Sequence, residues 1–180
     1  QTCALPICIS QDKSKSAYWY KKCARQGWGM KKIEKSLIKK AKKGDVVSQY
    51  NLSLSYRDGG IGFLKNYDLA FYWANQAAQQ GFGSAQCILG DMYERGWGTS
   101  VNYVEAEKWF NLAIDNGDKN AKFNLGALFL RSDYANYPKA AEIFEEFVKE
   151  KGNEDAQNNL AIAYFHLKRY DDAILWATKA

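Results

Sequence analysis

Four cysteines are the strongest candidates for nucleophilic or metal chemistry in this sequence of 180 residues. Cys3, Cys8, Cys23 and Cys87 form no Cys-x-x-Cys pair and no cysteine–histidine spacing of the kind that binds zinc. Cys87 adjoins apolar residues, and Cys23 stands where later parts of the chain carry alanine. We interpret both as reduced thiols at small packing positions. The cysteines therefore predict neither a nucleophile nor a metal ion.

The single histidine and the paired carboxylates give no better catalytic candidate. His166 precedes leucine and lysine, and no serine or cysteine motif supplies a nucleophile for it. We therefore expect a histidine at the surface or in a turn. The carboxylate pairs stand among lysines, as they do on solvated helix faces: Glu105 with Glu107, and Glu145 with Glu146. We predict that the protein is not an enzyme and has no catalytic residues, no cofactor and no metal.

Two glycine clusters resemble phosphate loops only superficially. Gly59-Gly60-x-Gly62 and Gly96-x-Gly98 lack a following Lys-Ser/Thr and a preceding strand. Glycine adopts backbone conformations that other residues resist, so both clusters are predicted to be turns between helices. Because such turns recur, they indicate that the chain is built from repeats.

A helical pattern of a small residue, a leucine and an aromatic residue occurs four times, at starting points 37, 36 and 35 residues apart. It begins at Ser48, Ala85, Ala121 and Ala156. A second pattern, small residue, aromatic, small residue, follows each time, with its aromatic at Trp73, Trp109, Phe144 and Trp176. Glycine follows the first three aromatics by eight residues, where a helix end is expected. Two helices in each repeat of this length predict an all-α solenoid.

The full pattern resembles the Sel-1-like repeat, a tetratricopeptide-like family. It reads Ala85-x-x-x-Leu89-Gly90-x-x-Tyr93-x-x-Gly96-x-Gly98, then Ala106-x-x-Trp109-Phe110-x-x-Ala113 and Gly117. The resemblance covers about residues 45–180. It departs in the third repeat, where Arg131-Ser132-Asp133-Tyr134 replaces the glycines, and in the fourth, which has the short turn of an ordinary tetratricopeptide repeat. The resemblance implies a right-handed αα-solenoid that serves as an adaptor.

The segment before residue 45 is less regular. Residues 16–27 fit the second helix of a preceding repeat, with Trp19 in the aromatic position, and residues 1–15 carry no pattern. Residues 30–43 predict a basic helix, which is either a native linking or capping helix or the product of an artefactual join near residue 29. Residues 1–7 resemble a translated sequencing adapter, and the pattern continues to residue 180, so we expect a fragment truncated at both ends. We expect three regions: 1–15, 16–44 and the array 45–180.

Charge and hydropathy narrow the possible partners. Residues 1–44 hold 12 basic and 2 acidic side chains, whereas residues 45–180 hold 13 and 18. No apolar run is long enough to cross a membrane, so we expect a soluble chain, and the sequence assigns no compartment. The lysines of the basic helix are interpreted as a solvated face, with contact to nucleic acid or an anionic membrane as the alternative. They are Lys31, Lys32, Lys35, Lys39, Lys40, Lys42 and Lys43.

The remaining candidate site is the concave face that the first helices of such a solenoid line. We predict that it binds a protein or peptide. The predicted contact residues are Tyr50, Asn51, Asp91, Glu94, Arg95, Asn124, Arg131, Asn158 and Asn159. The recurrent asparagines at 51, 124 and 159 could hydrogen-bond a bound peptide or tie one repeat to the next. The regular Trp/Phe positions are interpreted as core between helices, in preference to a base-stacking surface.

One branch of the resembling family offers an enzymatic alternative. Its repeats carry paired cysteines, and it is associated with β-lactam binding. No repeat of this chain has such a pair. A β-lactam hydrolase is therefore kept only as a secondary hypothesis.

Overall fold

The computed structural model describes residues 30–59, 63–149 and 153–180, apart from the side chains of residues 30–33. Within these ranges all regular structure is helical, which confirms the predicted all-α class. The α-helices are α2 (Met30–Lys42), α3 (Val46–Asp58), α4 (Tyr67–Ala78), α5 (Gly83–Arg95), α6 (Tyr103–Asp115), α7 (Ala121–Leu128), α8 (Tyr137–Phe147), α9 (Glu154–His166) and α10 (Tyr170–Ala177). The predictions for residues 1–7 and 16–27, and for Trp19, fall outside the described residues.

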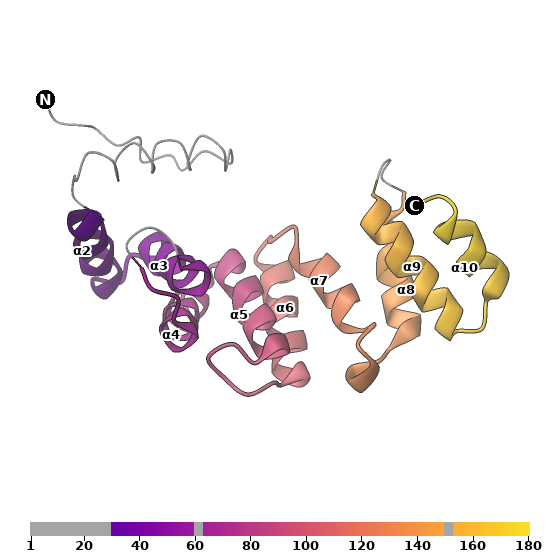
Figure 1. Ribbon diagram of the computed structural model, residues 1–180, viewed down its shortest axis with the longest axis horizontal. Coiled ribbons are helices and arrows are strands. Elements are labelled where there is room, and N and C mark those ends of the chain that lie inside the picture. The colour runs from indigo at the N-terminus through magenta and orange to yellow at the C-terminus, as the bar shows by residue number, and fades with distance from the viewer. Residues whose placement is uncertain (1–29, 60–62, 150–152) are drawn as a thin grey trace, which may run out of the picture.

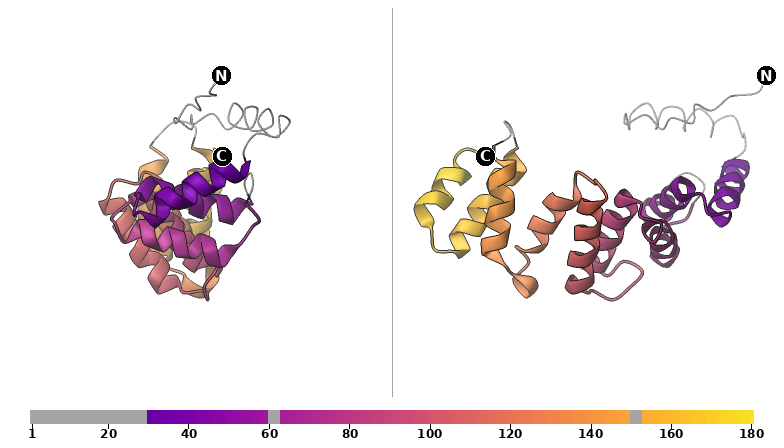
Figure 2. Two further views of the ribbon diagram at one scale, coloured as in Figure 1. Left: turned by 90° about the vertical axis from the view of Figure 1, so that its left-hand side faces the viewer. Right: turned by 180° about the vertical axis from the view of Figure 1, so that it is seen from behind.

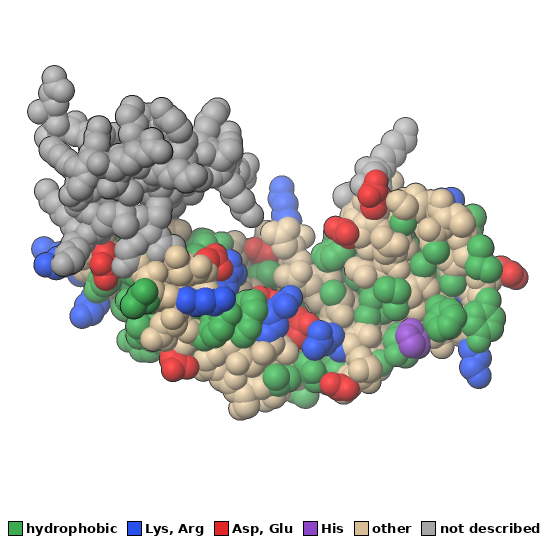
Figure 3. Space-filling model, viewed as in Figure 1, with side chains coloured by type: hydrophobic (Ala, Val, Ile, Leu, Met, Phe, Trp, Pro, Cys, Tyr) green, Lys and Arg blue, Asp and Glu red, His purple; other side chains and the backbone are tan. Residues whose placement is uncertain are grey.

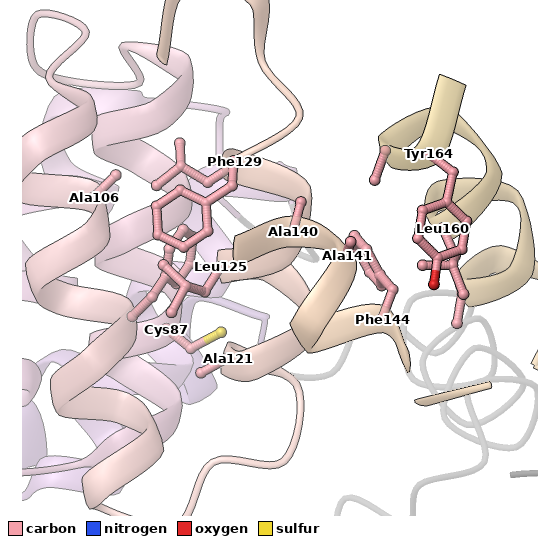
Figure 4. Packing of buried hydrophobic residues seen from close by; sticks show 14 of the residues in the cluster. Cys87, Ala106, Ala121, Leu125, Phe129, Ala140, Ala141, Phe144, Leu160 and Tyr164 are labelled. Carbon is pink, nitrogen blue, oxygen red and sulfur yellow. The ribbon is translucent and has the colours of Figure 1, made fainter. Parts of the chain in front are cut away.

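The helices form a single row along the long axis of the molecule (Figure 1). Each helix packs mainly on its neighbours in the chain, as expected for a solenoid. Helices α3 and α4 make unit 1, α5 and α6 unit 2, α7 and α8 unit 3, and α9 and α10 unit 4. The largest apolar cluster runs without a break through units 2, 3 and 4. Figure 4 shows Leu125 and Phe129 directed toward unit 2, and Phe144 near the unit 4 residues Leu160 and Tyr164.

Asparagine caps begin the second helix of the first three units. The Oδ1 atoms of Asn66, Asn102 and Asn136 accept hydrogen bonds from the backbone N–H three residues on, at 2.9, 3.1 and 3.3 Å. Such a cap satisfies a backbone donor that has no partner within the helix. Asn153 caps α9 in the same way. These asparagines fix where the helices begin.

The glycine that follows the repeat leucine allows the two helices of a unit to pack closely. Phe110 of α6 is fully buried and lies against Gly90 of α5. A Cβ atom at position 90 would stand only 2.7 Å from the Phe110 ring, so any larger residue would separate the two helices. The adjacent Trp109 also packs between helices as predicted, since this half-buried residue contacts the apolar cluster of α4 and α5. Phe110, however, is the residue that is fully buried. Like Trp109, Trp176 is half-buried, whereas Trp73 and Phe144 are buried as predicted.

A buried glutamine joins consecutive units at one edge of the array. Gln86 Nε2 donates to the carbonyl of Ala78 in the preceding unit at 3.1 Å, and its Oε1 accepts from Asn116 Nδ2 at 2.9 Å. Gln49 makes the same two bonds, donating to Ala41 at 3.0 Å and accepting from Gln80 at 2.6 Å. We call this arrangement the glutamine clamp.

The clamp also defines the place of α2. Ala41 near the end of α2 receives the glutamine bond that Ala78 of α4 receives one unit later. Helix α2 therefore packs on α3 as the second helix of a preceding unit would. Its Ala41 is buried, with Leu37 and Ile38 partly buried beside it. The choice between a native linking helix and an artefactual join stays open.

Stacked rings join the units at the opposite edge. The first residue of α4, α6 and α8 is a tyrosine whose ring contacts a ring of the next unit. Tyr67 stacks on Trp97 with the ring centroids 5.1 Å apart, and Tyr103 meets Tyr134 at 5.6 Å. Tyr137 stacks on His166 at 4.2 Å. His166 is exposed at the end of α9, the position that the sequence predicted for it.

Unit 3 and the end of the chain depart from the regular pattern. Helix α7 has 8 residues where α3, α5 and α9 have 13, and a 3₁₀ turn, Ser132–Tyr134, follows it. The regular part of α10 ends at Ala177. The backbone N–H groups of Thr178 and Ala180 still donate to the carbonyls four residues earlier, at 3.0 and 3.2 Å, so helical hydrogen bonding continues to residue 180.

Candidate protein-interaction surface

The nine predicted contact residues stand on α3, α5, α7 and α9 or directly after α7. We call the exposed sides of these four helices the first-helix face. Figure 3 shows this side of the molecule, where basic and acidic side chains gather together near its middle. Arg95 and Arg131 are the most accessible of the predicted charged residues, with side chains 51% and 50% exposed.

Arg95 is held in place by a carboxylate on its own helix. Its Nε lies 2.5 Å from Asp91 Oδ1, one turn earlier on α5. This hydrogen bond raises the pKa of the Arg95 guanidinium, so its charge is fixed. Arg57 of α3 interacts electrostatically with the same Asp91 and pairs with Asp58 at 2.7 Å. The structure thus brings the α3 and α5 charges together.

Glu94 continues this charged row to unit 3. Its side chain is only 10% exposed, and its Oε1 lies 3.7 Å from Arg131 Nη1. Burial raises the pKa of this carboxyl group, while Arg131 and Arg95 act in the opposite direction. The long distance leaves the buried carboxylate weakly paired, so it can accept a further hydrogen bond.

The predicted asparagines have different environments. Asn124 Nδ2 donates to Cys87 Sγ at 3.3 Å, and so it ties α7 to α5. For Asn51 and Asn159 no side-chain hydrogen bond is found among the described residues, and Asn158 is exposed. Of the two roles considered for the recurrent asparagines, a hydrogen bond from one repeat to the next is therefore found for Asn124. Tyr50 is half-buried and packs edge-on against Phe82, with ring centroids 5.2 Å apart.

The structure supports a packing role for Cys87. The thiol is buried, and burial raises its pKa to about 12. The thiolate required for nucleophilic attack is therefore scarce at neutral pH. Within the described residues no group of three or more histidine, cysteine, aspartate or glutamate side chains could hold a metal ion.

The first-helix face carries charged residues in unit 2 and apolar residues at the same positions in unit 4. Asp91 and Glu94 stand two and five residues after the repeat leucine of unit 2, and the same positions of unit 4 carry Ile162 and Phe165. These apolar side chains are 45% and 59% exposed. Sequence analysis missed both of them, and it also missed Arg57. A comparison of repeat positions would have found all three, because the face is periodic.

Two further observations concern the membrane and anion alternatives. No helix of the described part is long and apolar enough to span a bilayer. On α2 the lysines with described side chains are exposed, at positions 35, 39, 40 and 42. Contact of this helix with nucleic acid or an anionic membrane stays a prediction.

Comparisons with known proteins agree with this geometry. The Sel1 repeat model matches residues 6–28, 46–82, 83–118 and 154–180. The chain is 33% identical over 92 residues to the Arabidopsis thaliana ERAD-associated E3 ubiquitin-protein ligase component HRD3B, covering 51% of this chain and 14% of that protein. It is 34% identical over 114 residues to the chitin synthase regulator SKT5 of Saccharomyces cerevisiae, covering 63% and 14%. The chain therefore spans about one seventh of either relative.

A solved structure shares the fold. The Sel1 repeat protein of Oxalobacter formigenes matches with a TM-score of 0.63 and 30% identity, over 79% of this chain and 60% of that one. Unit 3, which lacks the glycine loop, is the part of the array that the family model leaves unmatched. Because the model matches well over half of the sequence and the structure is a helical solenoid, this chain belongs to the Sel1 repeat family.

Proposed function

We propose that this array is a non-catalytic scaffold that binds a protein or peptide along its first-helix face. The observation that carries the proposal is the pair Arg95 and Arg131. They stand at equivalent positions of consecutive units, each side chain is half exposed, and each has a carboxylate partner. Arg95, which its hydrogen bond to Asp91 already holds in place, loses less conformational entropy when it binds a ligand, and arginine is enriched among residues that dominate interfaces.

The relatives support a scaffold. One is a component of a ubiquitin ligase and another is a regulator of chitin synthase. Both descriptions place a Sel1 repeat protein beside an enzyme. A role in assembly or regulation follows for this chain if its repeats are used in the same way.

The chemistry of the described residues favours binding over catalysis. Cys87 is buried with a raised pKa, and His166 is stacked on Tyr137. A β-lactam hydrolase would need an activated nucleophile, which neither residue provides. Turnover of a chromogenic β-lactam by the purified protein would contradict this part of the proposal.

A peptide selection tests the first-helix face. Peptides displayed on phage would be selected on the wild-type protein, and their affinities measured by fluorescence anisotropy. We expect R95Q/R131Q to bind the selected peptides at least about tenfold more weakly. The matched control K65Q/K108Q removes two exposed cations from elsewhere on the array and should leave binding unchanged. Equal affinities for wild type and R95Q/R131Q would refute the proposal.

A further inference from the structure

A groove lies between α6 and α8, away from the first-helix face. Two adjoining hollows of about 470 and 400 Å³ share the lining residues Glu107, Phe129 and Lys139. None of the nine predicted contact residues lines either hollow. Together the hollows form what we call the α6–α8 groove. It is therefore a surface separate from the one proposed above.

The irregular third unit creates the groove. Helices α6 and α8 are joined mainly through α7, which packs on both (Figure 2). Because α7 has only 8 residues, the chain leaves the helix at Phe129 and continues into the 3₁₀ turn. Tyr134 of that turn donates a hydrogen bond to Glu107 of α6 at 2.7 Å and so joins the turn to α6.

The bottom of the groove is apolar. Leu125 of α7 and Phe129, directly after α7, line it together with Ile114 of α6 and Ile143 of α8. Leu125 and Phe129 are buried, whereas the two isoleucines are partly exposed. A bound side chain would therefore meet hydrocarbon at the bottom, and its burial would stabilise a complex.

The rim of the groove is acidic. Four carboxylates line it against two ammonium groups, and both ammonium groups are already paired. Lys122 pairs with Glu146, and Lys139 Nζ lies 3.8 Å from Glu107. The other two carboxylates, Asp133 and Glu142, have no cationic partner among the described residues. Asp133 accepts hydrogen bonds from Ser132 Oγ at 3.2 Å and from the Tyr103 hydroxyl at 3.5 Å, which leave its charge unneutralised. An anionic ligand would find only paired cations, whereas a cationic one would find two carboxylates without a cationic partner.

We propose that the α6–α8 groove binds a basic segment of a partner protein, in which an apolar side chain is flanked by lysine or arginine. The lining part of α8 runs from Lys139 to Glu146, which is roughly 10 Å of helix. That length matches about three residues of extended peptide. The apolar side chain enters the hollow beside Leu125 and Ile143, because Lys139 Nζ already lies 5.1 Å from the centre of the Phe129 ring. The flanking cations meet Asp133 and Glu142.

A defined peptide tests the proposal. The probe is a fluorescein-labelled pentapeptide of alternating lysine and leucine, and its binding to the 180-residue chain is measured by anisotropy. We expect D133N/E142Q to bind it about tenfold more weakly, because both carboxylates without a cationic partner are lost. The matched control E105Q/D171N removes two carboxylates outside the groove and should bind normally.

A substitution with the opposite effect separates the groove from general charge attraction. Lys139→Gln removes the cation that competes for Glu107, and we expect it to tighten binding about threefold. Lys108→Gln removes the same charge from a position on α6 outside the groove, and it should not change the affinity for the peptide. Equal responses to K139Q and K108Q, or equal losses in D133N/E142Q and E105Q/D171N, would overturn the proposal.

Two further outcomes decide the identity of the ligand. Peptides with glutamate for lysine, or serine for leucine, should bind at least about tenfold more weakly. Undiminished binding of either would show that the rim or the apolar bottom plays no part. A dimer in sedimentation that D133N/E142Q dissociates would assign the groove to a second copy of the chain. The R95Q/R131Q variant should bind the pentapeptide normally, so this proposal and the first-helix proposal can fail separately.

Discussion

Units 2 and 3 carry nearly the same apolar pattern but differ in the connection between their helices. Leu89 and Leu125 are both buried, and Gly90 and Gly126 both lie against a phenylalanine of the second helix. In unit 2 the chain continues to Arg95 and ends the helix with a left-handed glycine. In unit 3 a polar segment without glycine follows a helix of 8 residues. The comparison shows that the apolar stripe determines which face packs, while the loop determines the length of the helix and the space beside it.

The glycine loop of unit 2 gives the largest expected effect. A Cβ atom on Gly98 would lie 2.3 Å from the backbone oxygen of Tyr67, and the residue has φ +72°. Backbone at this distance cannot move aside. We expect Gly98→Ala to lower the free energy of unfolding by roughly 3 kcal/mol, measured by urea denaturation. Gly117→Ala is the control, because its φ is also positive but nothing lies within 4 Å, and it should cost only about 1 kcal/mol. Equal costs would show that the loop is not held against unit 1.

The glutamine clamp is the next test, because unit 3 has Lys122 in the clamp position. Gln86→Leu leaves the Ala78 carbonyl and the Asn116 amide without their shared partner. We expect a loss of about 2 kcal/mol in the free energy of unfolding. Lys122→Ala removes only an exposed ion pair and should cost less than about 0.5 kcal/mol. A cost for Gln86→Leu as small as that for Lys122→Ala would mean that the clamp contributes no stability.

The glycine after the repeat leucine, Gly90 in unit 2 and Gly126 in unit 3, allows the packing of the two units to be compared directly. Gly90→Ala places a methyl group 2.7 Å from the fully buried Phe110 ring, so we expect a loss of about 1 kcal/mol even after the gain in helix propensity. At Gly126 the nearest atoms, at 2.9 Å, belong to Ile143 and Phe144. Ile143 borders the α6–α8 groove and can move into it. Because the fully buried Phe144 ring cannot move in the same way, Gly126→Ala should still cost stability, but less than Gly90→Ala in the same denaturation experiment. A larger loss at Gly126 would show that the groove is rigid.

The smallest effect is the pH dependence that Glu94 gives to stability. Its folded-state pKa is raised by burial above the ordinary value of 4.5, so the folded state binds the proton more tightly than the unfolded state does. Between these two pKa values the contribution of Glu94 to stability falls as the pH rises. Glu94→Gln removes this dependence. We expect the variant to become more stable relative to wild type as the pH rises above 4.5, measured by thermal melting. A constant difference across that range would contradict the assignment.

The repeat periodicity predicted the fold well because each unit repeats the same packing problem. The helix pairs, the buried leucines and the left-handed glycines at 81 and 117 followed from spacing alone. Spacing alone did not predict which aromatic ring lies at the centre of the packing in unit 2, because Trp109 and Phe110 are adjacent and both are large and apolar. Only the contact between Phe110 and Gly90 decides which of them is central.

The candidate site was predicted less completely than the fold. The charged residues of α5 were found, since they follow the buried stripe at helical spacing. Arg57, Ile162 and Phe165 were missed because they occupy equivalent positions with different chemistry. The α6–α8 groove was also missed. It depends on the early end of α7, and departure from a repeat pattern indicates irregularity without indicating the shape that results.

The glutamine clamp has a consequence for how such a chain can grow. Gln86 bonds to the Ala78 carbonyl of unit 1 and to Asn116 of its own unit, so unit 2 carries the glutamine and the amide donor, while the acceptor comes from the unit before it. A tandem duplication of residues 82–117 would give the inserted copy its own glutamine and its own amide donor, and would leave the original joint intact. Because the remaining acceptor is a backbone carbonyl, which any residue supplies, gene duplication or protein engineering could lengthen the array at unit 2 without redesigning the clamp. Duplication of unit 3 would instead insert a unit that carries Lys122 where unit 2 has the clamp glutamine.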